Sequence, residues 1–176
     1  MEKDTNKLFI ALPSPPIIAK VQQELIQRNE ALTGIKWVPE ANLHITVFFL
    51  GFVKIVHLPK VKEIMAKCLE NKPVFTLHLS GITFEGGRPS HPSMIWARFE
   101  RNVKFTELAT KLGTHLSPLI DGPTKFPDPI PHITLARIKH QPAPQIDVEV
   151  QCDVPFKGYD LWKSISIDGQ VKYEKL

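Results

Sequence analysis

Hydrophobic positions recur along the chain in two patterns, which predict strands and helices that follow one another. Apolar runs rich in β-branched and aromatic residues predict strands at residues 8–12, 43–50, 75–80, 94–99 and 133–138. Apolar residues spaced three or four positions apart predict helices after Ser14, between Val61 and Leu69, and after Asn102. Ser14 and Asn102 are expected to cap their helices, because a side-chain oxygen there can accept from free backbone N–H groups. This mixture of elements favours an α+β fold.

Glycine and proline positions mark the expected boundaries between these elements. Gly51 closes the second strand, and the second helix must end before Pro73, which cannot continue it. Residues 86–89 and the proline-rich stretch 121–131 are predicted to be loops. Apolar and polar residues alternate again at 146–152 and at 165–167, which predicts two more strands. Turns are expected at Gly158 and Gly169.

The same three letters open two of the predicted strands, as His44-Ile45-Thr46 and His132-Ile133-Thr134. A single His-x-Thr would be uninformative in a chain with 7 histidines. Both copies, however, continue with an aliphatic residue, follow a proline-containing loop and open an apolar strand preceded by a helix. This repetition indicates a weak internal duplication, in which the two halves form one α+β unit around a central cleft. We expect residues 1–176 to form a single domain.

Each motif presents an imidazole and a hydroxyl side by side, because residues two apart on a strand point to the same face. Two such pairs across a cleft suit phosphodiester hydrolysis: one histidine takes the proton of water and the other protonates the leaving oxygen. The hydroxyls of Thr46 and Thr134 can meanwhile bind the phosphoryl oxygens. Histidine populates both protonation states near neutral pH, and the motifs lack the neighbouring carboxylates of a magnesium site. We therefore expect catalysis without a metal or another cofactor.

Composition adds few constraints beyond those of an ordinary globular protein with 43% hydrophobic residues. Only two cysteines occur, Cys68 and Cys152, without a metal-ligand cluster, so a disulfide framework or zinc site is not expected. The net charge of +4 is compatible with an anionic partner. No apolar run is long enough to cross a membrane and the N-terminus does not resemble a signal peptide, which predicts a cytoplasmic protein.

The segments 42–51 and 131–137, read as NLHITVFFLG and PHITLAR, resemble the paired signatures of the two-histidine (2H) phosphoesterase superfamily. Within it, the chain is most similar to the RNA 2′,3′-cyclic phosphodiesterase or 2′-5′ RNA ligase family. The resemblance also includes residues 8–13, Trp37 and the 95–97 strand, and so covers nearly the whole chain. It implies a bilobal fold of two antiparallel-sheet lobes with flanking helices, related by pseudo-twofold symmetry.

The same resemblance implies an activity and its substrates. RNA ends or nucleoside 2′,3′-cyclic phosphates would be hydrolysed to 2′-phosphates, and some members join RNA ends through 2′-5′ linkages in reverse. In the family, the first-motif histidine is assigned as the acid and the second as the base, which carries over to His44 and His132. No obligate protein partner is indicated, and we expect a monomer without membrane association.

Two further side chains are candidates for substrate binding. Arg137 matches a family arginine that contacts the phosphate region, but simple alternation puts it on the face opposite His132. It reaches the cleft only if its strand bulges or ends first. Phe48 shares parity with His44 and stands where many relatives carry a polar or basic residue. It can either line the cleft and stack on a base or be a core aromatic.

Two other functions remain open from the sequence. One is a related phosphodiesterase that acts on 2′-5′ oligonucleotides or on other cyclic nucleotides, because specificity depends on loops outside the motifs. The other is a non-catalytic module that binds RNA ends in the same cleft. A pure binder has no need for two complete acid–base motifs, which favours an enzyme.

Overall fold

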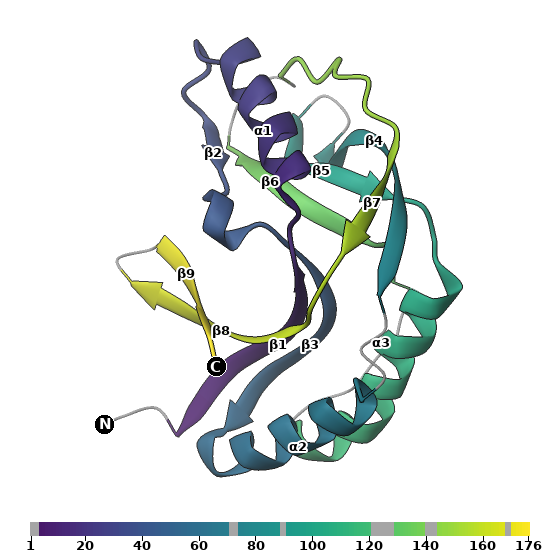
Figure 1. Ribbon diagram of the computed structural model, residues 1–176. Helices are drawn as coiled ribbons and strands as arrows, with labels where there is room; N and C mark the ends of the chain where they lie inside the picture. The colour runs from purple at the N-terminus through teal and green to yellow at the C-terminus, as the bar shows by residue number, and fades with distance from the viewer. Residues whose placement is uncertain (1–3, 71–73, 89–90, 121–128, 140–143, 168–169) are drawn as a thin grey trace.

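The computed structural model describes residues 4–70, 74–88, 91–120, 129–139, 144–167 and 170–176. In this part of the chain, nine strands form one antiparallel sheet with three helices (Figure 1). The strands are β1 (Thr5–Pro13), β2 (Ile35–Trp37), β3 (His44–Lys54), β4 (Phe75–Arg88), β5 (His91–Phe99), β6 (His132–Ile138), β7 (Cys152–Phe156), β8 (Asp160–Ile167) and β9 (Gln170–Lys175). The helices are α1 (Pro16–Arg28), α2 (Leu58–Cys68) and α3 (Val103–Leu116), and the short 3₁₀ turns are Glu40–Asn42, Ile55–His57 and Ser117–Leu119. None of the helices in these ranges is long and apolar enough to cross a bilayer.

The sheet has two similar halves, which confirms the predicted bilobal α+β fold. Its strand order is β7-β4-β5-β6-β3-β1-β8-β9, so the motif strands β3 and β6 are neighbours at the middle, paired through Ile45 and Ile133. In one half β1 leads through α1 to β3, and in the other β5 leads through α3 to β6. β1 pairs with β3 as β5 pairs with β6, and both pairs carry a register shift, at Ile10/Ala11 and at Ile95/Trp96. The duplicated halves thus share even a β-bulge.

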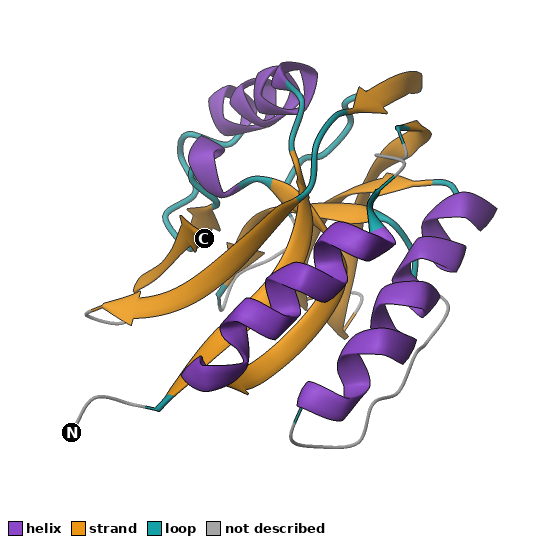
Figure 2. Cartoon of the chain, turned by 60° about the horizontal axis from the view of Figure 1, so that its bottom comes forward, coloured by secondary structure: helices purple, strands orange, loops and turns teal. Residues whose placement is uncertain are grey.

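All three helices contribute to one hydrophobic core that includes alternate residues of the strands. Helices α2 and α3 lie side by side over one end of the sheet, whereas α1 lies over the other (Figures 1 and 2). The predicted apolar stripe of α3 is fully in this core, at Phe105, Leu108, Ala109, Leu112 and Leu116. As predicted, Asn102 caps α3, because its Oδ1 accepts a hydrogen bond from the backbone N–H of Phe105 at 3.1 Å.

Several predicted boundaries are wrong for identifiable reasons. Ser14 does not cap α1, whose N-cap position is Pro15 and has no side-chain hydrogen bond. Because Pro15 and Pro16 lack N–H groups, fewer donors remain for a cap to satisfy. The strand that begins at His44 does not end at Gly51 but continues to Lys54. Gly51 has a φ of 73°, which lets the chain bulge and then pair with β1 again.

Two other segments also differ from expectation. Residues 86–88, predicted to be a loop, extend β4 in its hairpin with β5. Residues 146–150 alternate like a strand but form none, and Val148 N–H donates to the carbonyl of Ile146 in a tight turn. Asn29 holds the start of this segment, because its Nδ2 donates to the carbonyl of Gln145 and its Oδ1 accepts from the N–H of Gln145. Pro89, Gly169 and residues 121–128 of the predicted loop lie outside the described residues.

Candidate active site

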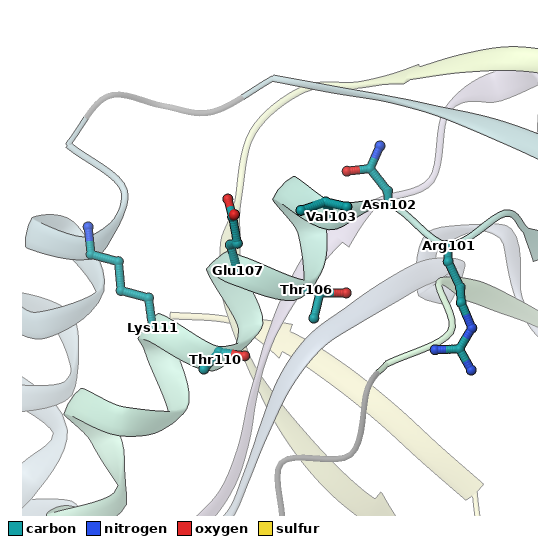
Figure 3. Close-up of a pocket in the computed structure, with 7 residues that line it drawn as sticks. All are labelled: Arg101, Asn102, Val103, Thr106, Glu107, Thr110 and Lys111. Atoms are coloured by element: carbon teal, nitrogen blue, oxygen red, sulfur yellow. The ribbon is translucent and has the colours of Figure 1, made fainter.

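Two of the hollows on the described surface are large enough for a ligand and differ in chemistry. A hollow of about 660 Å³ beside the start of α3 is lined by Arg101, Asn102, Val103, Thr106, Glu107, Thr110 and Lys111 (Figure 3). Its described lining combines acidic and basic side chains and comes from a single helix and its cap. The other hollow, of about 370 Å³, is the central cleft and contains both motifs. The cleft is therefore the candidate active site.

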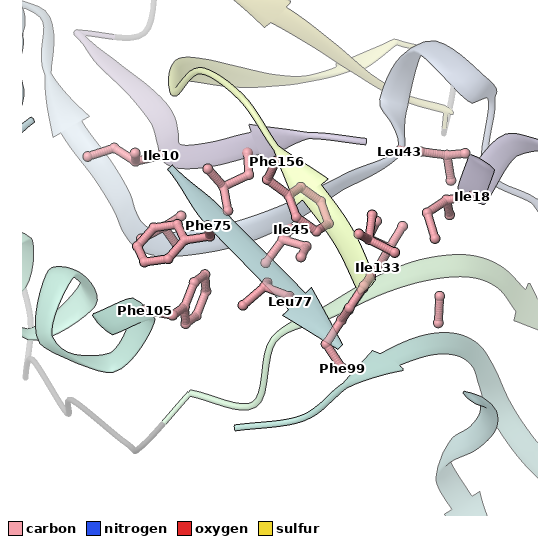
Figure 4. Close-up of a cluster of buried hydrophobic side chains, with 14 of the residues drawn as sticks. Ile10, Ile18, Leu43, Ile45, Phe75, Leu77, Phe99, Phe105, Ile133 and Phe156 are labelled. Carbon is pink, nitrogen blue, oxygen red and sulfur yellow. The ribbon is translucent and has the colours of Figure 1, made fainter. Parts of the chain in front are cut away.

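The central strand pair positions the two motifs on one face of the sheet. Ile45 and Ile133 pair directly across β3 and β6 and point into the core, as Figure 4 shows. The residues on either side of them must point to the opposite face, which is the cleft. The cleft is lined by Lys36, Trp37, Val38, Pro39, Asn42, His44, Thr46, His132, Thr134, Arg137, Lys139, Val171 and Tyr173. Both histidines and both threonines predicted from the sequence are thus brought together.

A backbone hydrogen bond fixes the orientation and tautomer of each histidine. Nδ1 of His44 lies 2.7 Å from the carbonyl oxygen of Asn42, and Nδ1 of His132 lies 2.8 Å from that of Ile130. A carbonyl can only accept, so Nδ1 carries the proton of the neutral ring and Nε2 is the nitrogen that can exchange a proton. Nε2 of His44 is also 3.2 Å from Oγ1 of Thr46. Because the bond to the carbonyl two residues earlier recurs, the duplication includes the site.

The rings around the two histidines differ. His132 stacks on Trp96, with ring centroids 3.6 Å apart and planes 13° apart. His44 instead contacts Phe9, Trp162 and Tyr173, at centroid distances of 4.9, 4.9 and 5.2 Å respectively. Trp96 lies opposite Thr134 across the β5–β6 pair, and the matching position opposite Thr46 is Ala11. The small Ala11 leaves room for the His44 ring, so aromatic residues from three strands reach it.

Burial lowers the pKa of both histidines below the ordinary value of 6.5. For His44, desolvation is the largest cause, the bond to the Asn42 carbonyl opposes it, and positive charge on His132 lowers the pKa further. For His132, desolvation again lowers the pKa, and the bond to the Ile130 carbonyl opposes it. Glu85 and Arg98 act on His132 in opposite directions, and they form an ion pair with each other at 3.0 Å. These shifts favour the neutral form of both rings.

A β-bulge turns Arg137 toward the cleft. Leu135 and Ala136 are consecutive and both buried, so the strand changes parity there and Arg137 points to the same face as His132. This is the condition under which the sequence allowed Arg137 to contribute, and Arg137 lines the cleft.

The matching bulge in β3 has the opposite effect on Phe48. It turns Phe48 toward the core, against which it packs, and directs Phe49 outward. Phe48 is absent from the described lining of the cleft, so the structure corresponds to the core alternative rather than to base stacking.

Positive side chains gather on one wall of the cleft. Lys36 of β2 is paired with Arg137 of β6, and Lys139 follows just after β6. All three line the cleft, and its described lining contains no carboxylate. Such a wall attracts an anionic ligand. In the described part of the chain, no three His, Cys, Asp or Glu side chains gather as a metal site would require.

Several of these residues were not recognised in the sequence. Trp96 and Trp162 lie outside both motifs, yet each packs against a motif histidine, and Trp162 is only 2% exposed. Lys36 has one available signal, its place next to Trp37 just before the first motif. Tyr173 has no such signal, because only the β8–β9 hairpin brings it to the cleft.

Comparison with known proteins finds phosphoesterases similar to this chain. The family model of LigT-like phosphoesterases matches residues 12–96. The chain is 34% identical over 134 residues to the RNA 2′,3′-cyclic phosphodiesterase of Methanocaldococcus jannaschii, covering 76% of this chain and 72% of that protein. It is 28% identical over 138 residues to the protein of the same name from Thermotoga maritima, covering 77% and 72%. The crystal structure of TT0787 of Thermus thermophilus is similar with a TM-score of 0.78 and 28% identity, covering 97% of this chain and 94% of that one.

Proposed function

The chain belongs to the LigT-like phosphoesterase family, and we propose that it hydrolyses the 2′,3′-cyclic phosphate ends of RNA to 2′-phosphates, with His44 and His132 as the acid–base pair. Relatives named RNA 2′,3′-cyclic phosphodiesterase support the substrate class. The observation that carries the proposal is the paired geometry of the two histidines. Each donates from Nδ1 to a carbonyl, and both line one cleft with a positive wall.

The reaction needs one proton acceptor and one proton donor on opposite sides of phosphorus. In the proposed assignment, neutral His132 takes a proton from water through Nε2 as the water oxygen attacks phosphorus. The bond from phosphorus to O3′ breaks, and protonated His44 gives its Nε2 proton to O3′. The phosphate stays on O2′, and the pair ends with its proton on the other ring. The proton count therefore balances over the reaction without a co-reactant.

The remaining cleft residues stabilise the phosphate. Thr46 and Thr134 offer hydroxyl donors beside the two histidines, and Arg137 offers a guanidinium that can bind two oxygens at once. Phosphate anions in the cleft favour protonation of a nearby imidazole. Substrate binding would thus counter the desolvation that lowers the pKa of His44 and prepare the ring as the acid.

The same geometry supports 2′-5′ ligation. A ribose 5′-hydroxyl can take the place of water, attack the cyclic phosphate and displace O3′. The product is then a 2′-5′ linkage, and its cleavage in the reverse reaction would regenerate the cyclic end. Related activity on 2′-5′ oligonucleotides is the second candidate function, and it would use the same two histidines.

A product assay tests the proposal. Purified protein is incubated with RNA that ends in a 2′,3′-cyclic phosphate, in the presence of EDTA, and the product is compared with 2′- and 3′-monophosphate standards. We expect turnover to the 2′-phosphate at the same rate with and without EDTA. Loss of activity in EDTA that zinc or magnesium restores contradicts the metal-free mechanism. Binding of the RNA without turnover would instead identify a module that binds RNA ends.

A further inference from the structure

Two phenylalanines of β3 are exposed on the cleft face of the sheet, beyond the motif histidines. Phe49 is 53% exposed and Phe52 is 58% exposed. Phe49 lies directly opposite Phe9, and Phe52 lies directly opposite Lys7, across the β1–β3 pair. Directly opposite residues of an antiparallel pair share a face. Phe9 contacts His44, so this face is the one that carries the cleft.

The buried ring of Phe9, which is 3% exposed, connects the two exposed rings to the active site. The Phe9 ring lies 4.9 Å from that of His44 and 5.0 Å from that of Tyr173, which lines the cleft. Phe49 is the next residue across the sheet from Phe9, and Phe52 is the outermost of the three. Phe49 and Phe52 are three positions apart, so strict alternation would put them on opposite faces of the sheet. The extra residue of the β3 bulge between them restores both rings to the same face.

A cationic side chain lies over one of these rings. Nζ of Lys7 is 5.5 Å from the centroid of Phe49, whereas Lys175, beside the buried Trp162, is paired with Asp160 at 2.7 Å. Across the sheet from Phe52, the row reads Lys7, Ser164 and Tyr173, and none of these is acidic. The surface defined by Lys7, Phe49 and Phe52, here named the platform, therefore combines exposed aromatic faces with positive charge.

This combination suits single-stranded nucleic acid. Proteins that bind single strands stack successive bases on aromatic side chains of a sheet and hold the backbone with cations. A 2′,3′-cyclic phosphate is the 3′ end of its strand, so every further nucleotide of the substrate extends to the 5′ side, out of the catalytic pocket. The platform is the aromatic surface that adjoins the pocket on this face.

We propose that the platform stacks nucleotides on the 5′ side of the terminal cyclic phosphate, which makes single-stranded RNA a better substrate than a nucleoside 2′,3′-cyclic phosphate. This inference rests on the proposed function but concerns a separate surface. A substitution at Phe52 tests the platform separately from the catalytic residues. Phe52 is exposed, lies outside the lining of the cleft, and is separated from His44 by Phe9 and Phe49.

The test compares kcat/KM of the wild type and Phe52→Ala on two substrates that share the same terminal nucleotide. One is a nucleoside 2′,3′-cyclic phosphate, and the other is a single-stranded oligonucleotide of about six nucleotides with the same cyclic end. We expect Phe52→Ala to lower kcat/KM on the oligonucleotide by about 5- to 150-fold, the usual range for loss of one stacked base. Its kcat/KM on the nucleoside substrate should stay within about twofold of the wild type, since one exposed side chain outside the pocket is changed.

Two matched variants complete the test. Phe52→Tyr keeps an aromatic face and should retain the oligonucleotide preference. Val103→Ala removes a hydrophobic side chain that is 74% exposed on α3, away from the cleft face, and should change neither substrate.

Any of three results would contradict the proposed role of the platform. The wild type could have equal kcat/KM on both substrates, Phe52→Ala could lower kcat/KM equally on both, or Phe52→Ala could leave kcat/KM on the oligonucleotide unchanged. The last would exclude stacking of RNA on Phe52. Failure of the wild type on both substrates is a different outcome, because it refutes the proposed function as well as the platform.

Discussion

Gln22 is a buried polar side chain that links helix α1 to β6 and to the residue just after β2, beside the cleft. It is 2% exposed, and its Nε2 donates to the carbonyl of Val38 at 2.8 Å and to that of Leu135 at 2.9 Å. Leu135 is the bulged residue that turns Arg137 toward the cleft, and its carbonyl also accepts from Val38 N–H at 2.9 Å. Gln22→Met keeps the length of the side chain and removes both donors.

The cost of Gln22→Met follows from what each carbonyl retains. The Leu135 carbonyl still accepts from the Val38 N–H, so loss of its bond to Gln22 lowers the free energy of unfolding by about 1 kcal/mol. The partly buried Val38 carbonyl loses the Gln22 donor, which costs roughly 1–2 kcal/mol. The total of about 2–3 kcal/mol corresponds to a Tm lowered by roughly 4–12 °C in a chain of this size. Thermal unfolding followed by circular dichroism measures the shift.

The neighbouring Gln23 supplies the control, because it is exposed on the same helix. Gln23→Met makes the same chemical change without removing a buried donor, and its Tm should stay close to that of the wild type. Equal Tm values for Gln22→Met and Gln23→Met would show that these hydrogen bonds do not stabilise the junction of α1 with β6 and the residue after β2.

Three further predictions concern catalysis. Burial lowers the pKa of both His44 and His132 below 6.5, and the active free enzyme carries one proton on the pair. A plot of kcat/KM against pH should therefore be bell-shaped with its centre below about pH 6.5. A centre above pH 7 contradicts this prediction. A substrate whose leaving oxygen needs no protonation should rescue His44→Ala far more than His132→Ala, and preferential rescue of His132→Ala reverses the acid and base. Arg137→Ala should lower kcat/KM by roughly 10- to 100-fold, the loss expected for a charge-assisted hydrogen bond; a change below twofold in steady-state kinetics would exclude Arg137 from phosphate binding.

The sequence predicted those features that depend on local pattern. Strands and helices with strong periodicity lie where expected, and the repeated motif was sufficient to predict a duplicated sheet with one cleft. Arg137 was predicted only on the condition of a bulge, and the bulge at Leu135 meets that condition. The cap at Asn102 also follows from local chemistry alone.

Features that depend on strand pairing could not be read from the same pattern. The bulge near Val47 reverses the face of Phe48, and nothing in the alternation of residues 44–50 signals it. Trp96 reaches His132 only because β5 pairs with β6 in one register, and Trp162 reaches His44 only through the β1–β8 pair. Residues 146–150 alternate between apolar and polar side chains as a strand does, but they form a tight turn and do not pair with the sheet.

The proposed mechanism requires one histidine from each half of the duplicated sheet. Initial rates of cyclic phosphate hydrolysis should be measured for His44→Ala, His132→Ala and the control His115→Ala, which changes an exposed histidine on α3 that bonds its own helix backbone. Circular dichroism should first establish that all three fold as the wild type does. We predict that His44→Ala and His132→Ala each lose at least about 100-fold in kcat/KM, the lower limit for loss of a general acid or base, while His115→Ala stays near the wild-type rate. A folded His44→Ala or His132→Ala that keeps a near wild-type rate would contradict the two-histidine mechanism.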